Sequence, residues 1–342
     1  MKEIAIELKS VKKQFGKSVA VNGIDLTINR GELVTFLGPS GCGKTTTLRL
    51  IAGLELPSSG VVKIDGQDVS QLAASDRNVG MVFQSYALFP HMTVLDNVVY
   101  GPVTRGEKKS DAVVRAHEVL SLIGLDGLSD RYPSELSGGQ QQRVAVARAI
   151  VQQPDVLLFD EPLSNVDAKL RRKVRNEIRQ LQQRFGITAV YVTHDQEEAL
   201  AVSDKVVVMK NGIIEQVGTP EELYTEPSSR FVADFIGDAN LITGKVDNGF
   251  FKAGQWKLKL LTEHLGMATV SIRPELISFL DDHTKGVDGK ICSATYLGSR
   301  VEYEVETSFG EILISRPANE VRKCADDIVK LNIAPESVIL VA

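Results

Sequence analysis

Four short apolar runs in the first part of the chain each end in polar chemistry. The runs are Leu33–Leu37, Val79–Phe83, Val156–Phe159 and Thr188–Thr193. They lead, in this order, into a glycine-rich loop, Gln84, the pair Asp160 and Glu161, and His194. Strand-like runs that alternate with helix-like segments predict an α/β fold with a parallel sheet. Because ligands bind beyond the carboxyl ends of such strands, we expect these polar residues to share one site.

Helical spacing replaces the strand pattern between Asp96 and Leu136, so we expect an inserted helical subdomain at about 91–150. A second amphipathic pattern predicts a long helix from Leu170 to Phe185. Its polar face carries five arginines, Arg171, Arg172, Arg175, Arg179 and Arg184. We interpret them as a solvated helix face.

The pattern changes again towards the end of the chain. Asn211 and Gly212 stand between two apolar runs and predict a β-hairpin. Beyond Gly237, short pieces such as ATVSI, VEYEV and EILIS alternate with Gly, Asp and Asn turns. This texture is typical of a small all-β domain. We therefore expect an α/β domain over residues 1–237 and a β domain over 238–342.

Composition narrows the class of protein. The chain has 342 residues, 43% of them hydrophobic and 24% charged, which is typical of globular proteins. Its net charge of −5 gives no global field for nucleic acid or anionic lipid. Three scattered cysteines, Cys42, Cys292 and Cys324, fit a reducing compartment such as the cytosol. We find no apolar run of about 18 residues and no signal-peptide pattern, so we expect any membrane role to come through a partner.

Residues 38–45 read GPSGCGKT and match the phosphate-binding P-loop pattern after a strand and before a helix. Glycines allow backbone N–H groups to surround phosphate oxygens, and the helix N-terminus adds positive potential. Lys44 would neutralise the outer phosphates and Thr45 would bind Mg²⁺. The candidate nucleotide-binding residues of this loop are Gly38, Pro39, Ser40, Gly41, Cys42, Gly43, Lys44, Thr45 and Thr46.

The strand VLLF ends in two adjacent carboxylates followed by Pro162. Asp160 could hold the Mg²⁺ shell while Glu161 acts as general base on a water. Paired acids after a strand also often cap a helix, but the P-loop favours the catalytic interpretation. Gln84 could reach the metal or the water, and His194 could contact the γ-phosphate or Glu161. Taken alone, either residue could be purely structural.

A second anion site is predicted at LSGGQ, where Ser137, Gly138, Gly139 and Gln140 begin another helix. Ser137 suits an N-cap, and the glycines expose N–H groups at a positive helix end. The chain thus has two phosphate-binding helix ends but only one nucleotide-binding fold. A head-to-tail homodimer explains this, because each site then faces the other across ATP.

These motifs, in this order, resemble the ATPase subunits of ABC importers along the whole chain. The resemblance identifies GPSGCGKTT as Walker A, Gln84 as the Q-loop, LSGGQ as the signature, VLLFDEP as Walker B, SNVDA as the D-loop and His194 as the switch histidine. It implies that Phe15 stacks on adenine and that Asp167 contacts the opposite subunit. Glu161, His194, Gln84 and Lys44 would be catalytic, and Thr45, Gln84 and Asp160 would bind Mg²⁺.

The β tail resembles the OB-like (TOBE) regulatory domain of importers for ferric iron, polyamines, maltose, sulfate and phosphonates, with IRPE at 272–275 as the marker. VFQSYALFPHMTV and RFVADFIGDANLITG look most like subunits for ferric iron or organophosphate uptake, and we rank iron first. The resemblance implies transmembrane permease partners, an indirect periplasmic or extracellular solute-binding protein, and a peripheral place on the cytoplasmic face of the inner membrane.

Two other functions compete with the transport motor. A soluble ABC ATPase could act on ribosomes or nucleic acid through the OB-like tail. Such proteins commonly carry two nucleotide domains, whereas this chain has one motif set, no basic tail and negative charge, so no nucleic acid partner is expected. Alternatively the tail could bind a regulator that inhibits uptake, which is compatible with the motor.

Overall fold

The computed structural model describes residues 3–164, 168–260, 264–280 and 286–341. The chain forms two compact units, residues 1–220 and 221–342. Each unit has hydrophobic clusters of its own.

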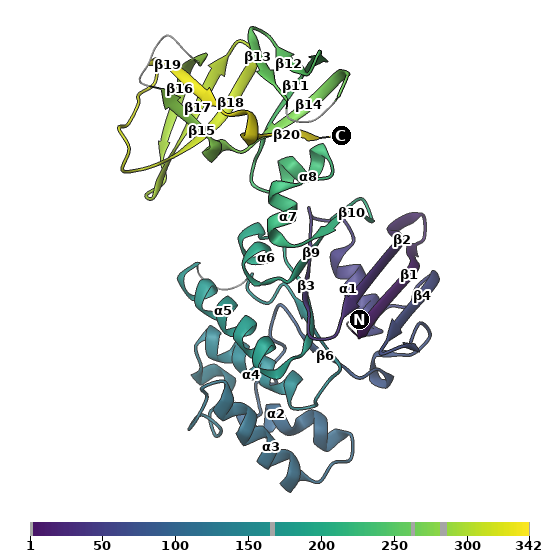
Figure 1. Cartoon of the computed structure of the whole chain (residues 1–342). Helices are drawn as coiled ribbons and strands as arrows, with labels where there is room; N and C mark the ends of the chain where they lie inside the picture. Colours follow the sequence, from purple (N-terminus) through teal and green to yellow (C-terminus); the bar gives the residue numbers. More distant parts are fainter. Residues whose placement is uncertain (1–2, 165–167, 261–263, 281–285, 342) are drawn as a thin grey trace. The chain divides into compact units, whose positions relative to one another are not determined.

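The centre of the first unit is a six-stranded sheet in the order β10-β9-β3-β8-β7-β6 (Figure 1). Its strands are β3 (Leu33–Leu37), β6 (Val79–Val82), β7 (Val156–Asp160), β8 (Thr188–Val192), β9 (Lys205–Lys210) and β10 (Ile213–Gly218). Neighbouring strands from β9 to β6 run parallel, which confirms the predicted parallel sheet. Asn211 and Gly212, both with positive φ, join β9 to β10 as the predicted hairpin.

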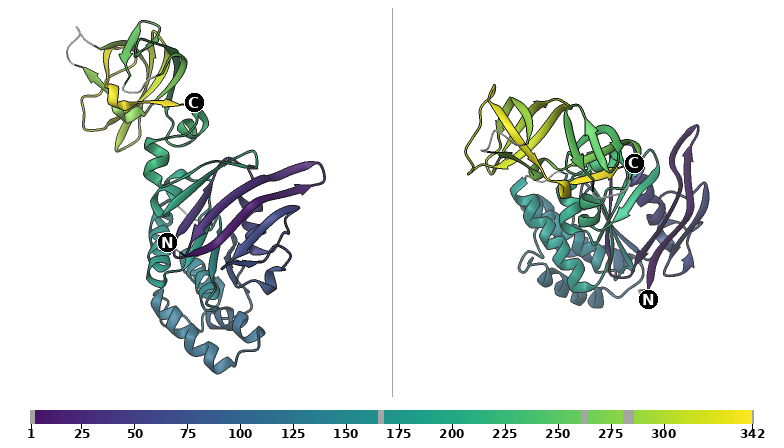
Figure 2. Two further views of the ribbon diagram at one scale, coloured as in Figure 1. Left: turned by 45° about the vertical axis from the view of Figure 1, so that its right-hand side comes forward. Right: turned by 45° about the horizontal axis from the view of Figure 1, so that its top comes forward.

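A second sheet, which is antiparallel, was not among the predictions. It has the order β2-β1-β4-β5, with β1 (Ile4–Phe15), β2 (Ser18–Asn29), β4 (Ser59–Ile64) and β5 (Gln67–Asp68). Helix α1 (Lys44–Ala52) lies between the two sheets (Figure 2). Its Leu48 and Ile51 pack in one core with Leu8 of β1 and Phe36 of β3. The P-loop helix is thereby fixed from both sides.

Helices α4 (Gly138–Ile150), α5 (Ala168–Phe185) and α6 (Gln196–Val202) pack on the other face of the central sheet. Helices α2 (Val94–Thr104) and α3 (Lys109–Leu122) pack against α4 and against each other. A second core joins Val144 of α4 and Val174 of α5 to Phe159 and Tyr191 of the sheet. Both faces of β7 and β8 are therefore covered, which explains their continuous apolar sequences. Helices α2 to α4 fall within residues 91–150, where the sequence predicts helices.

The prediction of a solvated arginine face on α5 is wrong for part of that face. Arg172 and Arg184 are exposed, but Arg171, Arg175 and Arg179 are half-buried. Arg179 makes a double contact with Asp204, with Nη1–Oδ2 and Nη2–Oδ1 distances of 2.9 and 2.5 Å. The carboxylates and carbonyls that engage these arginines lie more than 20 residues away in sequence, so helical spacing alone could not reveal them.

The second unit is a β structure of two five-stranded sheets with orders β13-β12-β11-β14-β20 and β15-β19-β16-β17-β18. The strands of the first sheet are β11 (Asn240–Asp247), β12 (Phe250–Ala253), β13 (Trp256–Lys259), β14 (Gly266–Ile272) and β20 (Val338–Val341). Those of the second are β15 (Ile277–Leu280), β16 (Val287–Tyr296), β17 (Arg300–Thr307), β18 (Gly310–Pro317) and β19 (Ile328–Ile333). Phe251 and Tyr303 belong to their shared core.

Helices α7 (Pro220–Thr225) and α8 (Arg230–Phe235) join this second unit, although the change in sequence texture comes only at Gly237. Arg273, whose side chain is 1% exposed, explains the difference. Its guanidinium donates to the carbonyls of Tyr224, Ala233 and Ile236, and it also stacks on the Tyr224 ring. The IRPE marker therefore contains the residue that fastens α7 and α8 to the β structure.

Candidate functional site

The ends of four parallel strands lie level along one edge of the central sheet. Asp160 of β7 is in register with Val192 of β8, and Val192 with Phe36 of β3. Val82 of β6 is in register with Phe159. The segments that follow these strands are the P-loop, Gln84, Glu161 and His194, so the structure brings together what the sequence predicted to share a site.

The P-loop runs from β3 into α1, and two of its glycines have no room for a side chain. A Cβ on Gly43, which has a φ of 107° and precedes α1, would lie 2.5 Å from the Ala20 carbonyl oxygen. A Cβ on Gly38 would lie 2.3 Å from the Met209 carbonyl oxygen. The backbone of the loop therefore passes close to β2 and β9 and cannot be displaced easily.

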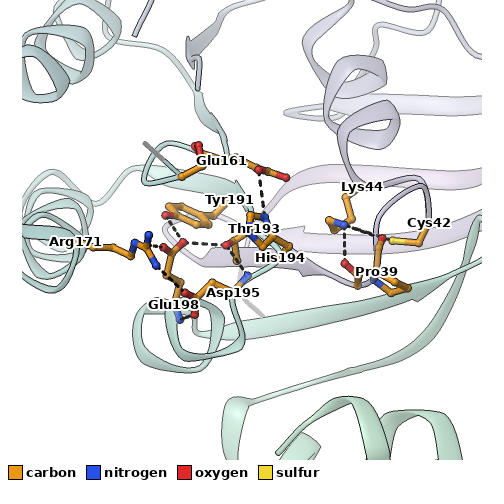
Figure 3. A network of polar contacts seen from close by, with 12 residues as sticks. Pro39, Cys42, Lys44, Glu161, Arg171, Tyr191, Thr193, His194, Asp195 and Glu198 are labelled. Carbon is orange, nitrogen blue, oxygen red and sulfur yellow. Dashed lines mark hydrogen bonds and ion pairs between the residues drawn. The ribbon is translucent and has the colours of Figure 1, made fainter. Parts of the chain in front are cut away.

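Lys44 is 6% exposed, and its ammonium points back into the loop (Figure 3). Its Nζ donates to the carbonyls of Gly38 and Pro39 at 2.6 and 3.0 Å. It also donates to Cys42 Sγ at 3.7 Å, and the Cys42 side chain is buried. The positive charge is thus held at the centre of the loop, next to the N-terminus of α1, whose free N–H groups add positive potential.

Asp160 and Glu161 place two carboxyl groups at the end of β7. Burial raises the pKa of the Asp160 carboxyl; the Arg49 charge opposes this shift and the Glu161 charge adds to it. Arg49 belongs to α1 and was not identified from the sequence, because its effect on Asp160 crosses from one element to another. A half-buried carboxylate beside a second acid favours a bound cation.

Glu161 is held against the neighbouring strand end. Its backbone N–H donates to the Val192 carbonyl at 3.1 Å, and its φ is 43°, a left-handed conformation that is uncommon outside glycine. Its Oε2 lies 3.2 Å from Nδ1 of His194 (Figure 3). The His194 side chain is 61% exposed, whereas that of Glu161 is 25% exposed. A carboxylate paired with an exposed histidine can accept a proton from water.

Phe15 and Gln84 are both exposed. Phe15 is the last residue of β1 and is 47% exposed, with Lys13 Nζ 4.8 Å from its ring centroid. An exposed aromatic face suits stacking on a base better than a core position. Gln84 follows β6.

The signature residues begin α4 among the helices rather than at the sheet edge. Ser137 accepts a hydrogen bond from the Gln140 N–H, and the Gln140 side chain accepts one from the Ser137 N–H, which completes a capping box. Ser137 and Gly138 are exposed, and a Cβ on Gly138 would meet nothing within 4 Å. This helix end is open to a ligand or a partner. Asp167 lies outside the described residues.

Comparison with known proteins gives the chain its family. A model described as ABC transporter matches residues 21–164, and a TOBE domain model matches residues 270–341. The Fe(3+) ions import ATP-binding protein FbpC of Agrobacterium fabrum is 50% identical over 98% of both chains. The protein of the same name from Escherichia coli O157:H7 is 46% identical over 98% of this chain and 97% of that one.

Solved structures agree with this assignment. The cbiO1 protein of Clostridium perfringens, part of the ABC transporter complex cbiONQ, matches with a TM-score of 0.61 and 29% identity over 66% of this chain and 92% of that one. A dimeric ATP-binding cassette bound to ADP and phosphate matches with a TM-score of 0.56 and 33% identity over 63% of this chain and 98% of that one. This chain therefore belongs to the family of ATP-hydrolysing subunits of ABC importers.

Proposed function

We propose that this ATPase subunit drives the import of ferric iron and that hydrolysis takes place at the edge formed by β3, β8, β7 and β6. The observation that carries the site is the Glu161–His194 pair, 3.2 Å apart, at strand ends next to the P-loop. Glu161 accepts a proton from the attacking water, and His194 orients Glu161 or contacts the γ-phosphate.

The remaining residues of the edge bind the nucleotide. Lys44 turns from the loop carbonyls to the outer phosphates, and the N–H groups from Gly38 to Thr46 surround the phosphate oxygens. Phe15 stacks on adenine, which its exposure at the end of β1 supports. Gln84 contacts the attacking water or the metal.

The donor set at this edge fits Mg²⁺. Asp160 offers a half-buried carboxylate whose pKa is raised by burial, and Thr45 offers a hydroxyl in the first turn of α1. Oxygen ligands of this kind suit a hard cation, and its charge would relieve the cost of burying Asp160. When bound, Mg²⁺ supplies charge neutralisation to the transferring phosphate. Thr45, Asp160 and Gln84 would hold it.

The complete site needs two copies of the chain. Ser137, Gly138, Gly139 and Gln140 form an open, positive helix end on a different part of the same unit, and they contact ATP bound by a partner subunit. Asp167 contacts the partner as well. The dimeric cassette among the structural relatives supports this arrangement.

The subunit works at the cytoplasmic face of the inner membrane, docked on permease subunits that receive the solute from a periplasmic binding protein. Among the described residues, no helix combines the length and apolar character needed to span a bilayer. Import proteins for Fe(3+) that match over nearly the whole chain support ferric iron as the solute.

The cargo is tested by uptake. Cells that lack their own ferric iron importer would receive this chain with its permease and binding protein, and the uptake of ⁵⁵Fe³⁺ and of a ¹⁴C-labelled sugar phosphate would be measured. We expect iron uptake that disappears with Lys44→Ala. Sugar phosphate uptake without iron uptake would contradict the assignment of the cargo while leaving the motor intact.

A further inference from the structure

A buried glutamate stands behind the switch histidine. Glu198 of α6 is 4% exposed, and its Oε2 accepts hydrogen bonds from Tyr191 Oη at 3.1 Å and Thr193 Oγ1 at 2.9 Å (Figure 3). Arg171 of α5 lies on its other side, with 3.7 Å between Arg171 Nε and Glu198 Oε1. A carboxylate is buried at this depth only where partners compensate for the lost water.

The hydrogen bonds of this glutamate reach both neighbours of His194 in the chain. Thr193 donates its hydroxyl hydrogen to the Glu198 carboxylate. The Thr193 hydroxyl oxygen also accepts a hydrogen bond from the Asp195 N–H at 3.0 Å. On the other flank, Asp195 Oδ1 accepts the Glu198 N–H at 3.0 Å and caps α6. The exposed His194 side chain therefore projects from a turn whose two ends are both tied to one residue.

Arg171 extends the same arrangement to α5. Its Nη1 lies 3.3 Å from Asp195 Oδ2, so one guanidinium contacts both Asp195 and Glu198. This contact joins the turn that carries His194 to the beginning of the long helix. The position of α5 can thus influence the turn.

The residues around Glu198 also lie next to the Glu161–His194 pair. One small cavity of about 40 Å³ is lined by Glu161 and His194 together with Arg171, Thr193 and Glu198. One water needs about 10–15 Å³ of such space, so the cavity holds a few waters at most and is far too small for a nucleotide. Glu198 therefore acts on the site by holding neighbouring groups rather than by touching ATP.

We propose that Glu198 is a positioning residue that, through Thr193 and Asp195, fixes the position of His194 relative to Glu161. We call Glu198, Thr193 and Asp195 the clamp, and Arg171 connects it to α5. The inference rests on the proposed role of the Glu161–His194 pair. Loss of the clamp leaves the phosphate loop intact but lets the turn at residues 193–195 move. A small misplacement of a reacting group lowers turnover by about 10- to 100-fold without weakening binding of the substrate.

The test compares the full-length wild-type chain with Glu198→Ala, Glu198→Gln and Thr193→Val. We expect Glu198→Ala and Thr193→Val to lower kcat at least about tenfold while KM for ATP stays within about twofold. Glu198→Gln keeps an acceptor for the Thr193 hydroxyl and should restore most of the loss. Glu197→Ala changes an exposed glutamate on the same helix and serves as the matched control.

A double variant separates positioning from a general structural role. Single-turnover hydrolysis with excess protein would be measured for His194→Ala with and without Thr193→Val. If the clamp works through His194, adding Thr193→Val should slow His194→Ala no further. The inference would be overturned if the rate losses of His194→Ala and Thr193→Val multiply in the double variant. It would also be overturned by a raised KM for ATP in the single variants, or by wild-type turnover in both Thr193→Val and Glu198→Ala. Absence of turnover in the wild-type chain would instead refute the proposed function.

Discussion

The backbone of Glu161 leaves β7 with a φ of 43°, a conformation that costs an L-residue about 1–3 kcal/mol. Its N–H bond to Val192 and the contact of its side chain with His194 hold it there. This left-handed conformation ends the extended course of β7, whose last residue is Asp160. At the scale of single residues, the site thus consists of groups held in place by neighbouring strand ends.

Removal of the P-loop ammonium should abolish turnover. In Lys44→Ala the loop keeps its glycines but loses the charge now bound to Gly38 and Pro39, so hydrolysis should fall by at least about 10²-fold and ATP should bind more weakly. Steady-state phosphate release and nucleotide titration would measure both. Lys173→Ala, an exposed change on α5, is the control. Near-normal turnover in Lys44→Ala would remove the loop from the mechanism.

Alkylation of Cys42 should inactivate the protein, because an adduct on this buried thiol would occupy space beside Lys44 and Gly38. ATP at about 100 times its Kd should slow the modification by up to about 100-fold if the reagent requires the nucleotide-free loop. The exposed Cys292 and Cys324 would first be replaced by serine. Equal labelling rates with and without ATP would count against a role of this loop in binding.

At the scale of elements, the sequence predicted the strands that carry the chemistry. β3, β7 and β8 are buried on both faces, so their apolar runs stand out in the sequence. β1 did not stand out, because register shifts at Leu8, Val11 and Lys13 break its regular alternation of buried and exposed residues. Contacts between elements, such as Arg171 with Glu198, could not be predicted because neither residue's own helical pattern reveals the other.

We expect Arg273 to stabilise α7 and α8 against local unfolding in the second unit. Replacing it with methionine would leave the carbonyls of Tyr224, Ala233 and Ile236 without their buried donor, at a cost of at least about 1.4 kcal/mol or tenfold in local opening. Hydrogen exchange of α7 and α8 in the full-length protein would measure this. Arg322→Met, at an exposed position, is the control. Unchanged protection of both helices would show that other contacts hold them.

At the level of the complete chain, the sheet edge that carries Lys44, Glu161 and His194 and the helix that begins after Ser137 lie in the first unit, and the TOBE domain match lies within the second. The exposed Ser137 and Gly138 give each copy a surface that another copy could complete with ATP. ATP that binds the closed pair more tightly than the separate subunits would shift the equilibrium towards the dimer.

The proposed role of Glu161 as general base of the two-subunit site is tested by Glu161→Gln. The amide keeps the size of the side chain but cannot accept the proton from water. Single-turnover hydrolysis should fall by at least about 10²-fold with ATP affinity little changed. Light scattering after size exclusion should show an ATP-dependent dimer of the variant that Ser137→Arg abolishes. Hydrolysis by Glu161→Gln at the wild-type rate would refute the assignment of Glu161 as the general base.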